Sequence, residues 1–486
     1  MDEIVEERNE NRIAKILVLL LTLFLIVSWI PSYGIPLGNS HEGRVLGQFA
    51  LHVSNFWELG ILDSSFGASW EPFSNIPYTH HPPLLTFLHL FNSSIAGQGL
   101  YQIKFISYFA GIATIPALFW MGQRLSLKPF ASVFSIFALI ATPWWWVYGR
   151  LGLGFTANIL MIGSIWALSA DPDNRKIKFA TAATFFAVVA SWHGVFLAPF
   201  LWLGVWWRRK FDRVSLLLMT SVALGLLVVL VWVIQGGGTS ELGDHFGERV
   251  EREWTWGEFF KRQWDFAKDL LPFWYLILAI PALVAGFRDI RTRFLTSSLL
   301  AMVLAFALIP ADGAWIHNYW NFPVLLALFP GFAVLAEYLL NFFESFFGRR
   351  ASPRVKKVGV CTSFLAVILA GFLSMDLGGL HKEYFDETAD AGRLTSLQRP
   401  PSTQETAWHL PQIPWPTWIS SEWNLPTESL ENLEDLLTVP DEDIVLVHLD
   451  RLPSWIDGSI VNEIKKRVGN YGVVSASSMR KHTVGL

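Results

Sequence analysis

The chain is dominated by long apolar runs that alternate with short polar segments. The first run, Ile16 to Ile30, follows Arg8, Arg12 and Lys15. Further runs cover roughly residues 104–123, 129–148, 153–169, 179–193, 195–207, 214–234, 271–287, 294–310, 319–342 and 357–375. A helix needs about 20 apolar residues to cross a bilayer, and tryptophans near the ends of the two shortest runs extend them into the interface. The pattern therefore predicts eleven transmembrane helices.

The basic residues between these runs predict the orientation of the chain. Lys and Arg cluster in every second loop, as they do in loops retained on the cytoplasmic side. The outer segment 32–100, by contrast, contains a single basic residue, Arg44, and the outer loop 235–270 carries charges of both signs. We therefore expect a cytoplasmic N-terminus in a multi-pass cell-membrane protein. An odd number of spans then places the C-terminus outside.

Two long outer segments are expected to fold outside the bilayer core. The first, 32–100, contains two partly apolar stretches, 43–62 and 84–97, which are too short or too polar to span and are typical of helices in the interface. The second is the C-terminal part, 377–486. It shows a strand pattern at 443–449, a helix pattern at 460–468 and a strand pattern at 472–476. We expect a membrane domain over residues 1–376 and a small extracytoplasmic α/β domain after it.

Composition supports a membrane protein and excludes several other classes. Hydrophobic residues make up 52% of the chain and charged residues only 16%, whereas soluble domains carry about a quarter charged residues. This excludes a single soluble domain and a disordered chain. The net charge of −4 predicts no nucleic-acid partner. The single cysteine, Cys361, allows no internal disulfide and no cysteine-based metal site.

The unusual polar residues collect on the predicted outer face, although they are far apart in sequence. Ionisable residues in such positions of a membrane protein are candidates for function. They are Glu42, Arg44, His80, His81, Arg150, His193, Asp312 and His317.

Three of these residues have chemistry suited to a charged substrate. Glu42 could act as a general base and Arg44 as a bidentate phosphate ligand, but the same pair is typical of a solvated loop. Arg150 follows three tryptophans and Tyr148, so it could anchor the helix in the interface or bind a lipid phosphate.

The histidines leave several interpretations open. His80 and His81 precede Pro82 and Pro83, and they could bind a divalent metal, bind phosphate or cap the following helix. A metal could also involve Glu42. His193 and His317, taken singly, are equally typical of packed core histidines.

With these residues assembled, the sequence resembles the GT-C membrane glycosyltransferases over roughly residues 10–375. It is most similar to the superfamily of dolichyl-phosphate-mannose–protein mannosyltransferases and aminoarabinose transferases. The motif that carries the resemblance is Tyr78-x-x-His81-Pro-Pro-Leu84 in the first outer segment. Supporting segments are Asn39–Arg44, Arg150 after Thr142-Pro143, and Ile316-His-Asn-Tyr-Trp320.

This resemblance implies an all-α polytopic enzyme that moves a sugar from a polyprenyl-phosphate donor to a protein or lipid-linked glycan acceptor at the extracytoplasmic face. Transfer would proceed by inversion with a carboxylate base, which here is Glu42, because His41 replaces the aspartate usual in the family. The resemblance also implies substrate contacts. The implied residues are His41, Arg44, Tyr78, His80, His81, Arg150, His193, His317 and Tyr319.

Two other functions fit a polytopic chain of this kind. A transporter or flippase for lipid-linked glycans would need polar residues through the membrane midplane and on both faces, and these spans are nearly free of charge at their centres. A non-catalytic subunit of a glycan assembly complex would not need Glu42, but it would need the C-terminal domain.

Overall fold

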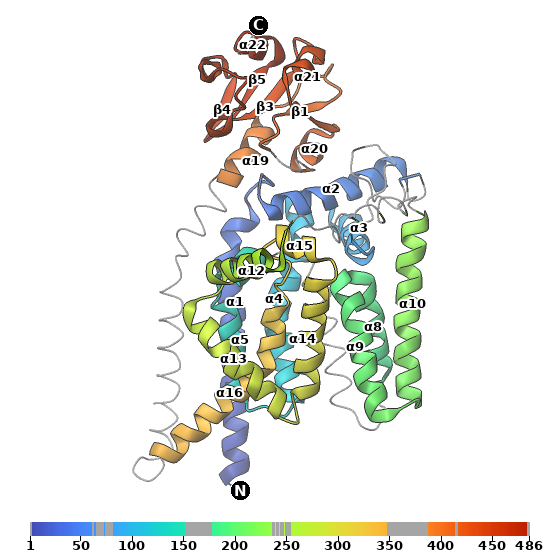
Figure 1. Ribbon diagram of the computed structural model, residues 1–486, viewed down its shortest axis with the longest axis vertical. Coiled ribbons are helices and arrows are strands. Elements are labelled where there is room, and N and C mark those ends of the chain that lie inside the picture. Colours follow the sequence, from blue (N-terminus) through green and yellow to red (C-terminus); the bar gives the residue numbers. More distant parts are fainter. Residues whose placement is uncertain are drawn as a thin grey trace.

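The computed structural model describes residues 2–60, 63–64, 72, 81–150, 177–235, 239, 243, 247, 254–347, 387–413 and 417–483. Most of the described elements are helices that stand side by side in a bundle, with a small α/β domain at one end (Figure 1). We call this end the upper end. The N-terminus lies at the opposite, lower end (Figure 1).

The helices of the bundle follow the apolar runs of the sequence closely. They are α1 (Asp2–Tyr33), α4 (Leu100–Arg124), α5 (Pro129–Ile140), α8 (Ile177–Ala190), α9 (Trp192–Arg209), α10 (Arg213–Gln235), α13 (Phe273–Arg288), α14 (Arg293–Leu308) and α16 (Val324–Phe347). The predicted run 129–148 is not one helix, because Thr142 caps a new short helix, α6 (Pro143–Tyr148), with a proline at its first position. The runs 153–169 and 357–375 lie outside the described residues.

Four described helices are long and apolar enough to cross a membrane. They are Arg8–Tyr33, Leu100–Arg124, Arg213–Gln235 and Val324–Phe342. The helix pair α12 (Trp256–Leu270) and α13, bent by 114°, would make a fifth if it is a single span. Shorter apolar helices such as α8 and α14 pack between them, and the total of eleven spans stays a prediction.

The core of the bundle depends on close helix packing. A Cβ atom on Gly331 of α16 would lie 2.1 Å from the carbonyl oxygen of Ala282 in α13, so only glycine allows these two helices to approach. Leu299, Leu325 and Phe332 are nearly or fully buried in the same apolar cluster.

At the upper end, several helices lie outside this core. The first outer segment forms α2 (His41–Leu59), which lies across the end of the bundle, and α3 (Leu84–Ala96) beneath it (Figure 1). Leu46 and Phe49 of α2 pack against Leu85 of α3. The amphipathic helix α12 and the short helix α15 (Ala311–Ile316) lie at the same end. The upper end is thus a layer of helices that covers the bundle.

The C-terminal domain is a five-stranded mixed sheet with helices on both faces. Its strands, in the order β2-β1-β3-β5-β4, are β1 (Ala407–His409), β2 (Thr427–Ser429), β3 (Ile444–His448), β4 (Lys466–Val468) and β5 (Tyr471–Ser475). One face packs on α19 (Glu387–Leu397) and α20 (Thr417–Trp423), and the other on α21 (Leu433–Thr438) and α22 (Ala476–Arg480).

The prediction of a helix at 460–468 is wrong. That stretch forms a 3-10 helix, Gly458–Glu463, followed by β4. The reason is the turn at Gly469, whose φ of 55° belongs to the left-handed region and lets β4 fold back antiparallel on β5. The strands at 443–449 and 472–476 correspond to β3 and β5.

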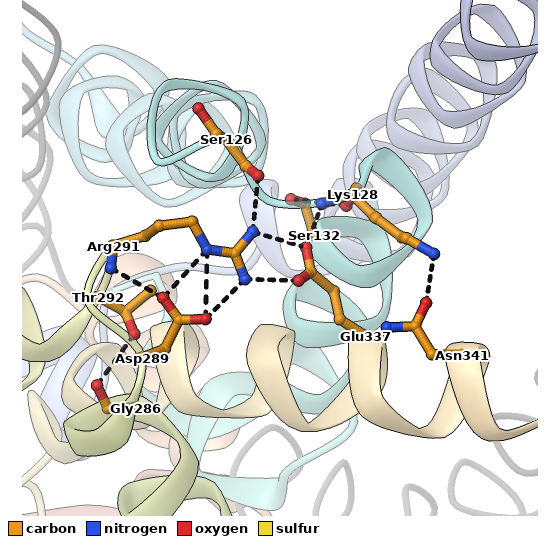
Figure 2. Close-up of polar contacts among 9 residues, drawn as sticks. All are labelled: Ser126, Lys128, Ser132, Gly286, Asp289, Arg291, Thr292, Glu337 and Asn341. Atoms are coloured by element: carbon orange, nitrogen blue, oxygen red, sulfur yellow. Dashed lines mark hydrogen bonds and ion pairs between the residues drawn. The ribbon is translucent and has the colours of Figure 1, made fainter. Parts of the chain in front are cut away.

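A polar network joins the loops at the lower end (Figure 2). Arg291 donates to Asp289 of its own loop and to the buried Glu337 of α16, with its Nη2 2.6 Å from Glu337 Oε2. It also donates to the backbone carbonyl of Ser126, 2.8 Å away. The backbone N–H of Lys128 donates to Glu337 as well. Glu337 therefore ties two interhelical loops to α16.

We predict that Glu337→Gln lowers the stability of the protein by about 2 kcal/mol, because it removes the buried one of the two carboxylates that pair with Arg291 and weakens the hydrogen bonds that tie both loops to α16. The midpoint of thermal unfolding in detergent measures this effect. Asp265→Asn is the control, since Asp265 pairs with Lys268 where both side chains are about half exposed. Equal midpoints for the two variants would contradict a structural role of the network.

Candidate active site

Glu42 is a buried carboxylate in the first turn of α2. Ser40 caps this helix, because its hydroxyl oxygen accepts from the backbone N–H of Gly43, 2.9 Å away. Glu42 is the second residue of the helix. The side chain points away from solvent, with 7% of the residue exposed. The amino-terminal end of a helix favours negative charge, so the local fold suits an ionised carboxylate here.

Two cations and a hydroxyl surround this carboxylate. Arg150 Nε lies 3.4 Å from Oε2, and Lys104 Nζ lies 3.8 Å from Oε1. The hydroxyl of Tyr108 lies 3.0 Å from Oε1. Both cationic side chains are only 3% exposed. The group of Glu42, Lys104 and Arg150, which we call the charge cluster, carries a formal charge of plus one and so favours an anionic ligand.

Lys104 also fixes the end of the first span. Its ammonium group donates to the backbone carbonyls of Ser32, at 2.8 Å, and Ile35, at 2.6 Å. The last carbonyls of a helix have no partner within the helix, and a lysine is suited to bind them. The hydroxyl of Tyr108 also lies 2.9 Å from Ser32 Oγ. Lys104 and Tyr108 thus connect α4 to both the end of α1 and the start of α2.

Arg44 does not lie in the charge cluster in this structure. Its guanidinium points back along the chain and donates to Asn39 Oδ1 from Nε at 3.3 Å and from Nη2 at 2.8 Å. Its charge acts on His41, which lies three residues earlier on the same face of α2, so the guanidinium is near that imidazole.

Four aromatic side chains from three segments form a group that we call the aromatic wall: His41, Tyr148, His317 and Tyr319. The rings of His41 and Tyr319 are 4.1 Å apart, and those of His317 and Tyr319 are 4.9 Å apart. Tyr148 is 5.6 Å from Tyr319 and 6.1 Å from His41. Because His41 precedes Glu42, the wall lies directly beside the charge cluster.

His41 in this wall is neutral at physiological pH. Burial, with smaller contributions from His317 and Arg44, lowers the pKa of His41 to about 3. An uncharged imidazole can exchange hydrogen bonds with a ligand without adding a positive charge.

The structure therefore brings together five of the residues singled out in the sequence: His41, Glu42, Arg150, His317 and Tyr319. Arg44 lies beside them. His193 lies one layer away, where its ring packs 4.2 Å from Phe306, which in turn stacks on Trp320. His81 is half-buried just before α3. Tyr78 and His80 lie outside the described residues.

Sequence reasoning missed Lys104, Tyr108 and Tyr148. A signal for Lys104 was present, because a lysine within an apolar run is costly in a membrane and marks a functional or structural partner. Tyr108 follows it by one helical turn and shares its face. Tyr148 could be assigned only once the break between α5 and α6 was known.

The charge cluster does not fit a metal ion. Its carboxylate faces two cationic side chains, which would repel a divalent cation, and a lysine ammonium and a guanidinium have no lone pair to donate. Across the part of the chain that the structure describes, no group of three or more His, Cys, Asp or Glu could hold a metal.

Two further buried histidines lie between α2 and α3. His52 Nδ1 is 3.1 Å from Thr86 Oγ1, and the ring of His89 stacks on Phe49 at 4.5 Å. Burial lowers the pKa of His52 and of His89 to about 3, with the neighbouring His89 contributing to the shift of His52. Both imidazoles are therefore uncharged in the folded protein at neutral pH.

These lowered pKa values predict that the protein loses stability in mild acid. A folded pKa of about 3 lies below the usual 6.5, so the unfolded chain binds more protons between these values, and stability decreases as the pH decreases below about 6.5. His89→Phe removes one titrating group while keeping a ring against Phe49. We expect the thermal midpoint of this variant to depend less steeply on pH between 7.5 and 5 than that of the wild type. Parallel curves would contradict the assignment.

Comparison with known proteins identifies the fold. Neither a protein-family model nor a curated protein matches the chain. Among solved structures, ArnT from Cupriavidus metallidurans bound to undecaprenyl phosphate matches with a TM-score of 0.61 and 12% identity, covering 95% of this chain and 97% of ArnT. ArnT in the apo state matches with a TM-score of 0.59 and 15% identity, covering 95% of this chain and 98% of ArnT.

A second kind of enzyme has the same architecture. The archaeal oligosaccharyltransferase AglB from Archaeoglobus fulgidus, in complex with an inhibitory peptide and a dolichol-phosphate, matches with a TM-score of 0.53 and 13% identity. The match covers 90% of this chain and 69% of AglB. At these low sequence identities the matches establish the fold, and they confirm the fold that the sequence resemblance implied. The chain has the fold of the GT-C membrane glycosyltransferases.

Proposed function

We propose that this protein is a membrane glycosyltransferase that moves a sugar from a polyprenyl-phosphate donor to an acceptor at the extracytoplasmic face. The observation that carries the proposal is the buried charge cluster beside the aromatic wall at the upper end of the bundle. The proposal is supported by the fold, which the chain shares with ArnT bound to undecaprenyl phosphate and with AglB bound to a dolichol-phosphate.

The donor would be held by charge at its phosphate and by ring contacts at its sugar. Arg150 has a planar guanidinium that can bind two phosphate oxygens, and the net positive charge of the cluster attracts the anion. The apolar face of a sugar ring can pack against aromatic rings, so we assign the aromatic wall to the sugar. Lys104 donates to backbone carbonyls and therefore acts mainly by holding Glu42 and Arg150 in place.

Glu42 is the proposed general base. Its carboxylate takes the proton of the acceptor hydroxyl or amide while the acceptor atom forms a bond to the anomeric carbon. The bond between that carbon and the phosphate oxygen breaks, and its electron pair stays on the polyprenyl phosphate. Attack opposite the leaving phosphate inverts the anomeric centre. Arg150 stabilises the negative charge that develops on the leaving phosphate.

The charge distribution supports this orientation in the membrane. Arg124 and Arg288 end helices at the lower end, and Arg291 lies in a loop there, which the basic loops assign to the cytoplasm. The upper end then faces outward. The sugar acceptor is a protein or a lipid-linked glycan, reached from this side.

A transporter is less well supported by the distribution of buried charge. Among the described residues of the bundle and its covering helices, the buried charged side chains are Glu42, Lys104, Arg150 and Glu337. The first three lie at the upper end and Glu337 at the lower end. A path for a charged headgroup would instead need polar groups near the midplane.

We predict that Glu42→Gln lowers transfer by about 100-fold or more, because it removes the proton acceptor while keeping the shape of the side chain. The assay uses the protein in lipid nanodiscs, a panel of labelled polyprenyl-phosphate sugars and a membrane extract as the acceptor source. The matched control is Glu58→Gln, which changes an exposed glutamate at the other end of α2 and should leave the rate unchanged. If Glu42→Gln transfers sugar like the wild type, Glu42 is not the base; if the wild type transfers from no donor, the proposed function is wrong.

We also predict that Arg150→Lys raises the KM for the donor about tenfold, because an ammonium keeps the charge but loses the planar fork that binds two oxygens. The measurement is the initial rate as a function of donor concentration. An unchanged KM would show that Arg150 does not bind the phosphate.

A further inference from the structure

The C-terminal domain packs directly on the start of α2. A Cβ atom on Gly47 of α2 would lie 2.7 Å from the backbone nitrogen of Trp418, and one on Gly392 of α19 would lie 2.2 Å from the carbonyl oxygen of Leu37. The hydroxyl of Thr417 donates to the backbone carbonyl of Arg44. Two glycines therefore allow backbone to meet backbone, so the domain and the segment that carries Glu42 form one packed unit.

A chain of hydrogen bonds crosses this contact. The amide nitrogen of Asn39 donates to the hydroxyl of Tyr471 at 3.0 Å, and the amide oxygen of Asn39 accepts from Nε and Nη2 of Arg44. Tyr471 lies on β5 and is 2% exposed, with its ring edge-on to His448 at 4.8 Å. The position of its hydroxyl is thus fixed by the sheet.

This arrangement determines which way the Asn39 amide faces. An amide has a donor end and an acceptor end, and only one orientation places the oxygen toward Arg44. The guanidinium of Arg44, which can only donate, selects that orientation, and the hydroxyl of Tyr471 accepts from the nitrogen end of the amide. Without this hydroxyl, Asn39 loses the bond that anchors its amide to the sheet, so the acceptor of Arg44 is no longer held in one place. The direction of the Arg44 side chain therefore depends on a residue of the C-terminal domain.

We propose that Tyr471 is a positioning residue for donor binding: through Asn39 it holds the guanidinium of Arg44 near His41 of the aromatic wall, where Arg44 contacts the anionic donor. This inference rests on the proposed function. It gives the C-terminal domain a definite part in the site, because the sheet supplies the fixed end of the hydrogen-bond chain.

The test is Tyr471→Phe in the full chain in nanodiscs, with the donor that the wild type uses. This variant keeps the ring and removes only the hydroxyl. We expect the KM for the donor to rise about threefold to tenfold, as for the loss of one hydrogen bond, with kcat changed less. Trp408→Phe is the control, since it removes a side-chain hydrogen bond to Asp443 within the same domain and should leave the KM unchanged.

A second pair of variants separates positioning from general damage. In an Arg44→Gln background, Tyr471→Phe should raise the KM no further, because the residue through which it acts is gone. Asn39→Leu should raise the KM as Tyr471→Phe does. Asn39→Asp still offers Arg44 an acceptor, so its KM should stay below that of Asn39→Leu even though its added negative charge repels the donor.

The outcomes distinguish this inference from the proposed function. If the wild type transfers sugar and Tyr471→Phe has the wild-type KM, the positioning role is wrong and the function stands. If Tyr471→Phe raises the KM equally with and without Arg44, its effect is structural and the inference fails. If Tyr471→Phe does not fold, the comparison of Asn39→Asp with Asn39→Leu decides, and equal KM values overturn the proposal. A wild type that transfers from no donor overturns the function itself.

Discussion

A carboxylate buried at the edge of a membrane is stable only if cations lie next to it, and this requirement organises the upper end of the bundle. Glu42 lies in the first turn of α2, while its partners Lys104 and Arg150 come from α4 and from the residue pair that follows α6. Removing one partner of a buried ion pair typically costs about 3–5 kcal/mol. The ends of α1, α2, α4 and α6 must therefore meet at one point. The aromatic wall forms there as a consequence, because His41 precedes Glu42 and Tyr148 precedes Arg150 by two residues.

The two ends of the bundle use buried charge for different purposes. At the lower end, Glu337 and Asp289 together satisfy Arg291, which also donates to a backbone carbonyl (Figure 2). In that network two carboxylates surround one guanidinium, and the network joins loops. At the upper end, the cations outnumber the carboxylate, and aromatic rings lie alongside. An excess positive charge next to rings suits a phosphate joined to a sugar, whereas a network with more carboxylates than cations does not attract an anion.

Much of this architecture could be predicted from the sequence, since a lipid environment imposes long apolar runs that α1, α4 and α10 show clearly. The meeting of Glu42 and Arg150 was also predictable, because both follow spans that end on the same side. The link between Asn39 and Tyr471 was not, since 432 residues separate them and no local pattern marks it. The strand β4 was mistaken for a helix because apolar residues at 460, 464 and 468 fit a helical period.

The most direct test of the account is an experimental structure of the protein in nanodiscs with a polyprenyl phosphate bound. We predict phosphate density at the upper end, within hydrogen-bond distance of the Arg150 guanidinium and on the side of the C-terminal domain. Phosphate bound instead at the lower end, near Arg291, or bound at the upper end without contact to Arg150, would contradict it.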